Sequence, residues 1–335
     1  MSVVLNNNVF EEYGGYLPLE LPIKQEYYST SDCMEVVGLS SGRAAIWYAT
    51  KQFLADKIYI PRFYCPTIYK NLITTTKLRI IEYSIDENLF PIIENYDPDT
   101  SIIILVNYFG ILNKQIEKIS NFFRNVIIDN AHSFFSCPIL KEDVYSVYSC
   151  RKFFGVPDGG YVIGRSFPNH FVLSRETSSN RMSHLLGSIE FGTNSSYKKH
   201  LENENHIGVK HSLMSKLTQR LMSSIDYHFI KKQRIANYSV LHNELKSLQL
   251  MKDIPSEVAA YCYPLLLNRD YHQELVKERI YVPTLWNHLV NQYDEHTLEY
   301  KYTKFFHCLP IDQRYSPEDM IKLANKIKQV ILNNK

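Results

Sequence analysis

Between residues 57 and 164 the chain alternates short apolar segments with segments of helical spacing, and this rhythm constrains the fold more than any other feature. A repeated order of strand, helix and strand is typical of a mainly parallel sheet with helices on both faces. The sequence therefore predicts an α/β protein, a three-layer sandwich whose ligands bind beyond the carboxyl ends of the strands. The segments expected to carry strands are residues 57–61, 78–84, 101–109, 125–133, 143–149 and 159–164.

The second half of the chain has a different pattern, which becomes helical from Arg181 and changes again near Pro255. Apolar spacing predicts helices around residues 214–225 and 235–245. A helix is also expected after Ser316, which supplies an N-cap ahead of a proline and two acidic residues. Residues 260–267, 280–286 and 306–311 are interpreted as strands of a small C-terminal α/β lobe. We thus expect an N-terminal arm (1–35), a large domain (36–210), connecting helices (211–250) and a small domain (251–335).

The composition narrows the class of partner. The 335 residues include 37 Lys and Arg against 35 Asp and Glu, without a basic run, so a nucleic-acid partner is not expected. No run of eighteen apolar residues occurs, so no membrane partner is expected either. The N-terminal segment has no signal-peptide pattern, and the six cysteines are scattered without CxxC spacing. These features predict a cytoplasmic, reduced protein without a structural metal site.

A lysine, Lys152, lies between an apolar segment and the turn Pro157-Asp158-Gly159-Gly160. In such a position the lysine stem either extends to solvent or presents a desolvated amine, which is a nucleophile toward carbonyl groups. Ser149, three residues before the lysine, is a candidate phosphate ligand. The Gly-Gly turn returns the chain as the next strand.

Two further segments end at the same predicted sheet edge. Ser41, Gly42 and Arg43 open a helix, which makes them either a cap and packing site or an anion site with a guanidinium group beside it. Asp129 follows three apolar strand residues and is either a helix cap or a carboxylate that keeps a ring nitrogen protonated. His132 is either a packed histidine or a partner of the same ring's hydroxyl group.

Taken together, these groups match the separate polar parts of pyridoxal 5′-phosphate (PLP), which are its phosphate, ring nitrogen, ring hydroxyl and aldehyde. The chain also resembles the DegT/DnrJ/EryC1/StrS family of PLP-dependent sugar aminotransferases, which have the type I aspartate aminotransferase fold. The resemblance rests on residues 41–46 (SGRAAI), 60–67 (IPRFYCPT), 128–132 (IDNAH), Lys152 with Gly159-Gly160, 214–217 (MSKL) and 309–320.

The resemblance implies a role for each matching residue. Lys152 would hold the cofactor covalently and move protons, Asp129 would pair with the pyridine nitrogen, and His132 would contact the ring or its hydroxyl. The implied phosphate ligands are Ser41, Gly42, Arg43 and Ser149, and Tyr64 is the aromatic residue assigned to stack on the ring. Arg43 replaces the family's usual threonine, and Val147 stands where the family has a serine, so Ser149 is expected to take over that contact. The asparagine that the family donates across its dimer has no clear match, and Asn194 is the substitute we name.

The implied activity is transfer of an amino group, from glutamate, to a keto sugar that is linked to a nucleotide and destined for surface polysaccharide. A homodimer is implied as well. Three alternatives stay open: a PLP-dependent sugar dehydratase of the same family, a non-catalytic descendant that binds a sugar or a partner, and a globular α/β protein in which the Ser-x-x-Lys spacing is a coincidence. The dehydratases usually have histidine in place of the lysine, so Lys152 disfavours the first, and the retained Lys152 and Asp129 argue against the second.

Overall fold

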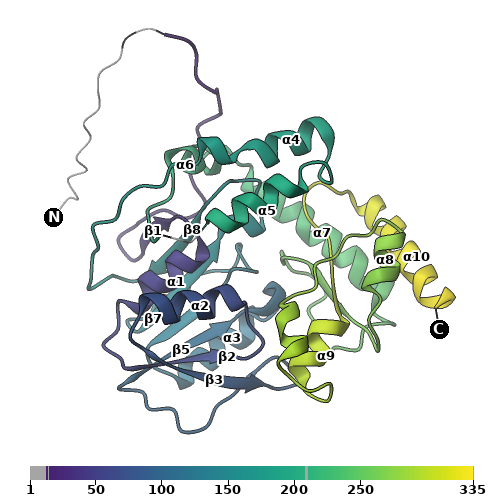
Figure 1. The fold of residues 1–335 in the computed structure, drawn as a ribbon, viewed down its shortest axis with the longest axis horizontal. Coiled ribbons are helices and arrows are strands. Elements are labelled where there is room, and N and C mark those ends of the chain that lie inside the picture. The colour runs from purple at the N-terminus through teal and green to yellow at the C-terminus, as the bar shows by residue number, and fades with distance from the viewer. Residues whose placement is uncertain (1–12, 14, 208–209, 335) are drawn as a thin grey trace.

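The computed structural model describes residue 13 and residues 15–207 and 210–334, so the first twelve residues of the predicted arm lie outside the described part. Its centre is an eight-stranded sheet in the order β1-β8-β7-β6-β5-β2-β3-β4 (Figure 1). Neighbouring strands from β3 to β7 are parallel, whereas β8 runs opposite to both of its neighbours and β4 runs opposite to β3. The strands are β1 (Glu35–Leu39), β2 (Lys57–Pro61), β3 (Arg79–Ile85), β4 (Pro91–Ile92), β5 (Ser101–Val106), β6 (Val126–Asp129), β7 (Val144–Ser149) and β8 (Gly160–Gly164).

Helices cover both faces of this sheet, which confirms the predicted mainly parallel α/β sandwich. Helix α1 (Gly42–Thr50) packs against β8, β7 and β6 on one face, beside α2 (Pro66–Thr75). Helix α3 (Asn113–Ile119) lies on the opposite face, because it shares a cavity with Ile128 and Asn130, whose side chains alternate with that of Asp129.

The remaining helices and a small sheet follow in the chain. The small sheet pairs β9 (Tyr263–Leu266) with β10 (Phe306–Leu309) in antiparallel register, and its helices lie together at one side of the large sheet (Figure 1). The helices are α4 (Ser183–Phe191), α5 (Tyr197–His206), α6 (Lys216–Met222), α7 (Tyr227–Leu245), α8 (His272–Lys277), α9 (Leu298–Phe305) and α10 (Pro317–Asn333). Short 3-10 helices are η1 (Tyr108–Gly110), η2 (Ser120–Phe122), η3 (Cys150–Lys152), η4 (Ser179–Arg181) and η5 (Asn287–Asn291).

One predicted strand is wrong. Residues 280–286 form no strand, because the chain turns there into η5 through Trp286, which has left-handed backbone angles (φ 57°, ψ 47°). A bulky residue rarely adopts this conformation, so apolar composition alone gave a misleading prediction for this segment. The terminal helix is as expected: Ser316 caps α10, and Asp319 completes a capping box.

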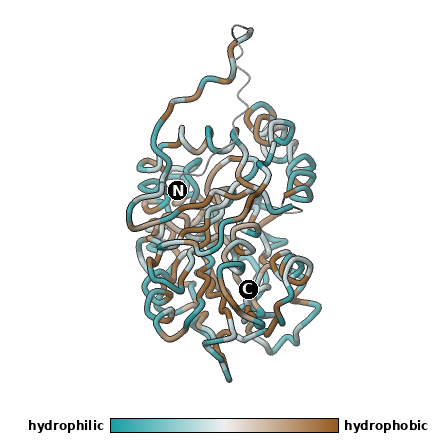
Figure 2. The backbone as a smooth tube through the Cα atoms, turned by 90° about the vertical axis from the view of Figure 1, so that its left-hand side faces the viewer, coloured by the Kyte–Doolittle hydropathy of each residue, from teal (hydrophilic) through white to brown (hydrophobic). Residues whose placement is uncertain are grey.

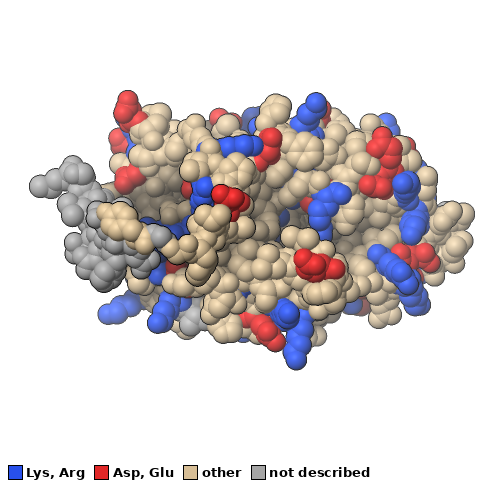
Figure 3. All heavy atoms as spheres, turned by 90° about the horizontal axis from the view of Figure 1, so that it is seen from above, with Lys and Arg blue, Asp and Glu red and all other residues tan. Residues whose placement is uncertain are grey.

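The apolar residues of the strands form the buried core. Every residue of β5 is buried, as expected for a strand with helices on both faces, and the brown apolar trace in Figure 2 concentrates in the interior. Acidic and basic side chains are interspersed over the face shown in Figure 3, without a large patch of one sign. In the described ranges no helix combines the length and the apolar character that a membrane crossing requires.

Candidate active site

A cavity of about 430 Å³ lies at the carboxyl ends of β6 and β7, beside the start of α1. Its position matches the rule that open α/β sheets bind ligands beyond their strand ends. All eight residues selected from the sequence line this one cavity: Ser41, Gly42, Arg43, Tyr64, Asp129, His132, Ser149 and Lys152. The structure thus brings together four segments that are up to about a hundred residues apart in the chain.

The lysine loop is placed by the turn that follows it. Lys152 ends η3, directly after β7, and the chain returns through Gly159 into β8. Gly159 has φ 114°, which favours glycine. A Cβ on Gly160 would come within 2.6 Å of the Ser41 backbone, so only glycine lets β8 pass this close to the start of α1. The Gly159-Gly160 pair therefore brings the loop that contains Lys152 close to the start of α1, where the candidate phosphate ligands lie.

The Lys152 amine is free for chemistry. It makes no hydrogen bond or ion pair with any residue that the structure describes, and it lies 5.5 Å from the centre of the Tyr261 ring. The side chain is exposed within the cavity, and the protein around the cavity desolvates the amine. This burial lowers the pKa of the Lys152 amine below its ordinary value, and the neighbouring Arg151 guanidinium acts in the same direction.

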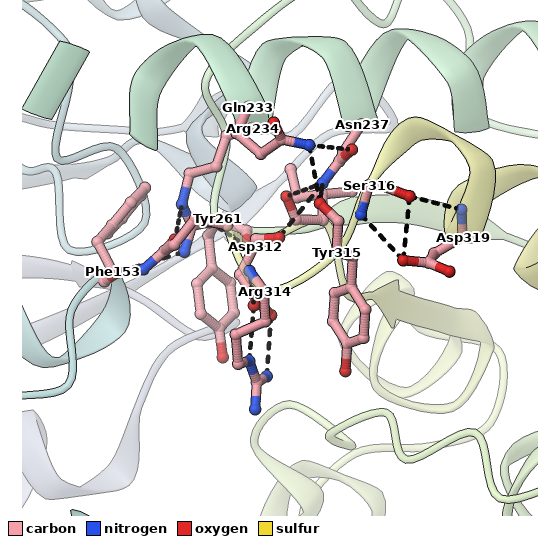
Figure 4. A network of polar contacts seen from close by, with 12 residues as sticks. Phe153, Gln233, Arg234, Asn237, Tyr261, Asp312, Arg314, Tyr315, Ser316 and Asp319 are labelled. Atoms are coloured by element: carbon pink, nitrogen blue, oxygen red, sulfur yellow. Dashed lines mark hydrogen bonds and ion pairs between the residues drawn. The ribbon is translucent and has the colours of Figure 1, made fainter. Parts of the chain in front are cut away.

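A polar network around Arg234 on α7 holds the base of this loop (Figure 4). The backbone carbonyl of Phe153, the residue after the lysine, accepts hydrogen bonds from Gln313 at 2.9 Å and from Arg234 at 3.5 Å. Arg234 also donates to the carbonyl of Tyr261 at 3.2 Å. The same buried guanidinium therefore ties the lysine loop to the tyrosine ring beneath the amine.

The Asp129 carboxylate is buried and directed into the cavity. It accepts hydrogen bonds from the Tyr64 hydroxyl at 2.5 Å and from the Ala131 backbone N–H at 2.8 Å. Burial raises the pKa of Asp129, while these two hydrogen bonds and the charge of Lys152 oppose the rise. Tyr64 thus contacts Asp129 through its hydroxyl, and its assigned stacking on a cofactor ring stays a prediction.

His132 forms a flat wall of the cavity. Its ring stacks on Tyr261 with centroids 4.7 Å apart and an angle of 11° between the planes. Burial lowers the pKa of His132 to about 3, so the imidazole is neutral at physiological pH. Its Nδ1 atom is buried and has no hydrogen-bond partner among the described residues. A neutral imidazole with an unused nitrogen is suited to contact a ligand's polar group.

The start of α1 has groups that are suited to bind an anion. The Ser41 hydroxyl caps the helix by accepting from the Ala44 N–H at 3.2 Å, and Ser149 faces Gly42 across the cavity wall. Arg43 reaches over the site, and its guanidinium donates to the carbonyl of Ile207 at 2.5 Å. Helix N–H groups, a hydroxyl and a guanidinium are together suited to bind phosphate.

Sequence reasoning missed two charged residues at the same end of the cavity. Arg151, the residue before the lysine, forms an ion pair with Glu204 on α5. Burial lowers the pKa of Arg151 to about 10, so it stays charged. The adjacent Arg-Lys pair could have been noticed in the sequence, whereas nothing local pointed to Glu204.

Trp286 is the third missed residue, and it brings the small lobe into the cavity. Its ring lies 6.3 Å from the His132 ring, with 7° between the planes, and 6.3 Å from the Tyr64 ring. Its left-handed backbone is a strained conformation of the kind that clusters at functional sites. The only sequence signal was that the chain has two tryptophans.

The residue named for a contact across a dimer lies away from the cavity. Asn194 does not line the cavity; its amide donates to the Tyr281 hydroxyl at 3.4 Å, and its proposed role across a dimer stays a prediction.

Among the described residues, ligand atoms of Asp270, His272 and His307 lie within 4.8 Å of one another. Both ring nitrogens of His307 already hydrogen-bond backbone groups, at 2.9 and 3.0 Å, so this cluster is explained by internal contacts.

No protein-family model and no curated protein matches the chain in sequence. Solved structures do match. The sugar aminotransferase CalS13 from Micromonospora echinospora aligns with a TM-score of 0.59 at 14% identity, over 88% of this chain and 87% of that chain. The putative sugar aminotransferase Spr1654 from Streptococcus pneumoniae, in its PLP form, aligns with a TM-score of 0.56 at 14% identity, over 88% and 86%.

A DegT DnrJ EryC1 StrS aminotransferase from Brucella abortus aligns with a TM-score of 0.55 at 15% identity, over 88% of this chain and 85% of that chain. The chain has the fold of these sugar aminotransferases. The resemblance predicted from the motifs is therefore confirmed at the level of the fold, along nearly the whole length of both partners.

Proposed function

We propose that the protein is a PLP-dependent aminotransferase that transfers an amino group from glutamate to a keto sugar. One observation carries this proposal: the unpaired amine of Lys152 opens into the same cavity as the buried carboxylate of Asp129. An amine with a lowered pKa is a nucleophile toward an aldehyde, and a carboxylate in low dielectric favours a protonated ring nitrogen.

The residues present fit PLP. The N-terminus of α1, Ser149 and the Arg43 guanidinium would hold the phosphate, and Asp129 would face the ring nitrogen. The orphaned, buried Nδ1 of His132 is one polar atom in the cavity wall that a bound cofactor would satisfy. PLP, when bound, supplies the electron sink that stabilises negative charge at the substrate carbon.

The chain's own residues then divide the work. Lys152, with its lowered pKa, exchanges between a neutral and a protonated amine, so its Nζ can take a proton from one carbon and return it to another. Asp129 would present its carboxylate to the ring nitrogen of a bound cofactor. Tyr261 lies under the amine, and the Arg234 network holds both in place. Leu285 and Trp286 of the small lobe line the cavity, where their apolar side chains would limit the access of water.

The finer assignments rest on resemblance and on surface features. The solved neighbours are sugar aminotransferases, which supports a sugar as the acceptor. A nucleotide link and a role in surface polysaccharide are what the family resemblance implies. A cytoplasmic location is proposed from the N-terminal segment, which has no signal-peptide pattern, and from the scattered cysteines. A homodimer is supported by large apolar side chains left exposed on one chain: Tyr16, Leu17 and Ile23 in the arm, and Leu186, Ile189 and Phe191 in α4.

Borohydride reduction followed by peptide mass spectrometry tests the covalent link. The purified protein is incubated with PLP, reduced and digested, and a pyridoxyl group is expected on the peptide that contains Lys152. A modification spread over surface lysines, with Lys152 unmodified, would contradict the proposal.

Visible absorbance then tests the reaction. Glutamate should shift the spectrum of the PLP-loaded protein, and a keto sugar should reverse the shift. A protein that releases water from a sugar substrate without consuming glutamate would instead be a dehydratase. A loaded protein whose spectrum responds to no amino donor would be the non-catalytic descendant.

A further inference from the structure

The hydrogen bond between Tyr64 and Asp129 has no role in the function proposed so far. Tyr64 lies between β2 and α2, 65 positions before Asp129, and its side chain is 5% exposed. Its hydroxyl is within 2.5 Å of Asp129 Oδ2, while the other carboxylate oxygen accepts only a backbone N–H, from Ala131. Tyr64 is thus the one side chain in the described residues that donates a hydrogen bond to this carboxylate.

The other ionisable groups near Asp129 do not replace it. They are Tyr108 of η1, His132 in the segment after β6, and Lys152 of η3. The Tyr108 hydroxyl donates to the backbone carbonyl of Phe63 at 2.8 Å. His132 is neutral, because burial lowers its pKa to about 3. Lys152 acts on Asp129 through space, without a hydrogen bond.

We propose that Tyr64 is a positioning residue that keeps the Asp129 carboxylate ionised and turned into the cavity, where it receives the protonated ring nitrogen of PLP. The inference rests on the proposed function, because it assigns Tyr64 to the cofactor site through Asp129. A hydroxyl donor stabilises the ionised carboxylate and has no charge of its own to compete with the ring. Burial raises the pKa of the Tyr64 hydroxyl well above its ordinary range, so Tyr64 remains a donor throughout the neutral range.

Loss of the Tyr64 hydroxyl should change the protonation of Asp129. Burial already favours the protonated form of Asp129, and a hydrogen bond to a charged group offsets that effect. Removing the Tyr64 hydroxyl should raise the proton affinity of Asp129, because one of the hydrogen bonds that oppose the effect of burial is lost. The pKa of Asp129 would then rise further above its ordinary value. A protonated Asp129 no longer forms a charge pair with the ring nitrogen, so PLP binding should weaken as the pH falls.

Tyr64→Phe and a matched control, Tyr108→Phe, test the assignment. Both substitutions remove one hydroxyl from a buried tyrosine in the same region, but Tyr108 donates to a carbonyl and not to Asp129. The affinity for PLP is measured by equilibrium dialysis between about pH 8 and about pH 6, and the ¹⁵N chemical shift of ring-labelled PLP reports protonation of its nitrogen. Tyr64→Phe should lose about tenfold in affinity across this range and show deprotonation of the ring nitrogen.

The wild type and Tyr108→Phe should keep their affinity and a protonated ring nitrogen over the same range. A Tyr64→Phe protein that behaves like Tyr108→Phe would overturn the inference while leaving the proposed function intact. A wild type that binds no PLP would overturn both. If Tyr64→Phe does not fold, Tyr64→Leu, which also lacks the hydroxyl, is measured in its place, and wild-type behaviour in that variant would overturn the inference. A ring nitrogen that is unprotonated in the wild type at neutral pH would contradict an ionised Asp129 and overturn it as well.

Discussion

Two cavities open on opposite faces of the large sheet, and the larger one is not the candidate active site. The second cavity measures about 610 Å³, against about 430 Å³ for the first. Consecutive residues of one segment separate them: Ile128 and Asn130 line the larger cavity, and Asp129 lines the smaller one. The alternation of side chains along a strand therefore gives one segment two different chemical faces.

The asparagine and serine side chains that line the larger cavity hydrogen-bond one another. The Asn107 amide donates to Asn113 at 2.7 Å and to Asn130 at 2.9 Å, and the Ser133 hydroxyl donates to Asn113 at 3.1 Å. The smaller cavity contains an unpaired amine, a buried carboxylate and an orphaned imidazole nitrogen. Unpaired and electrostatically shifted groups therefore distinguish the candidate active site from the larger cavity, whereas volume does not.

Replacing a lysine should have a much larger effect on activity at the smaller cavity than at the larger one. Lys152→Ala should abolish the covalent attachment of PLP and lower kcat by about 10⁴-fold or more, because the amine serves both attachment and proton transfer. Lys231→Ala, at the larger cavity, is the control and should leave both unchanged. Kinetics and reduced-protein mass spectrometry give the readout. Equal losses of PLP attachment and kcat in the two variants would contradict the assignment of the active site to the smaller cavity.

Asp129→Asn tests the charge on the β6 side of the smaller cavity. The amide keeps the shape of the carboxylate but not its charge, so kcat should fall by about 10²- to 10⁴-fold. Stability in urea should be kept or increased, because a buried charge is removed. Transamination rates and urea unfolding measure the two effects, and full activity in this variant would contradict the assigned role of Asp129.

The pH dependence of stability should reveal the neutral histidine of the smaller cavity. The pKa of His132 is lowered to about 3 by burial, against 6.5 as the ordinary value, so the unfolded chain binds the proton more tightly. Its stabilising effect is complete above pH 6.5 and is lost as the pH falls toward 3, by up to about 5 kcal/mol. His132→Gln should flatten this part of the curve in urea unfolding at several pH values. An unchanged pH slope would show that His132 is not buried in its neutral form.

Asn130→Ala tests the larger cavity as a structural element. The substitution removes one acceptor of the buried Asn107 amide, so the free energy of unfolding should fall by about 1–3 kcal/mol. The pH slope of stability and the kcat of the folded protein should stay at wild-type values. A loss of PLP binding without a loss of stability would mean that the larger cavity belongs to the active site.

The smallest effect is spectroscopic and locates the bound cofactor. The chain has two tryptophans, and only Trp286 lines the smaller cavity; neither lines the larger one. PLP should therefore quench the fluorescence of Trp47→Phe, which retains Trp286, and have little effect on Trp286→Phe. The reverse result would place the cofactor away from the small lobe.

The chain's local patterns predicted much of the fold and the polar groups at the strand ends. Residues 57–61 were expected as a strand and form β2 with the same bounds, because apolar runs between turn residues report burial directly. The helix start at Ser41 and the turn after Lys152 were equally local, since capping and turn geometry depend on residues a few positions apart.

Contacts between distant segments were decided only by the tertiary structure. The Tyr64 hydroxyl on Asp129, the Glu204 carboxylate on Arg151 and the Trp286 ring over the cavity join segments that no local pattern relates. Residues 280–286 have the composition of a strand but end in the left-handed Trp286, because packing against the cavity outweighs local preference there. Local patterns in the sequence set which chemical groups lie at the strand ends. Packing between distant segments decided which of them are paired, because a hydrogen bond or an ion pair forms only where the fold brings its two partners together.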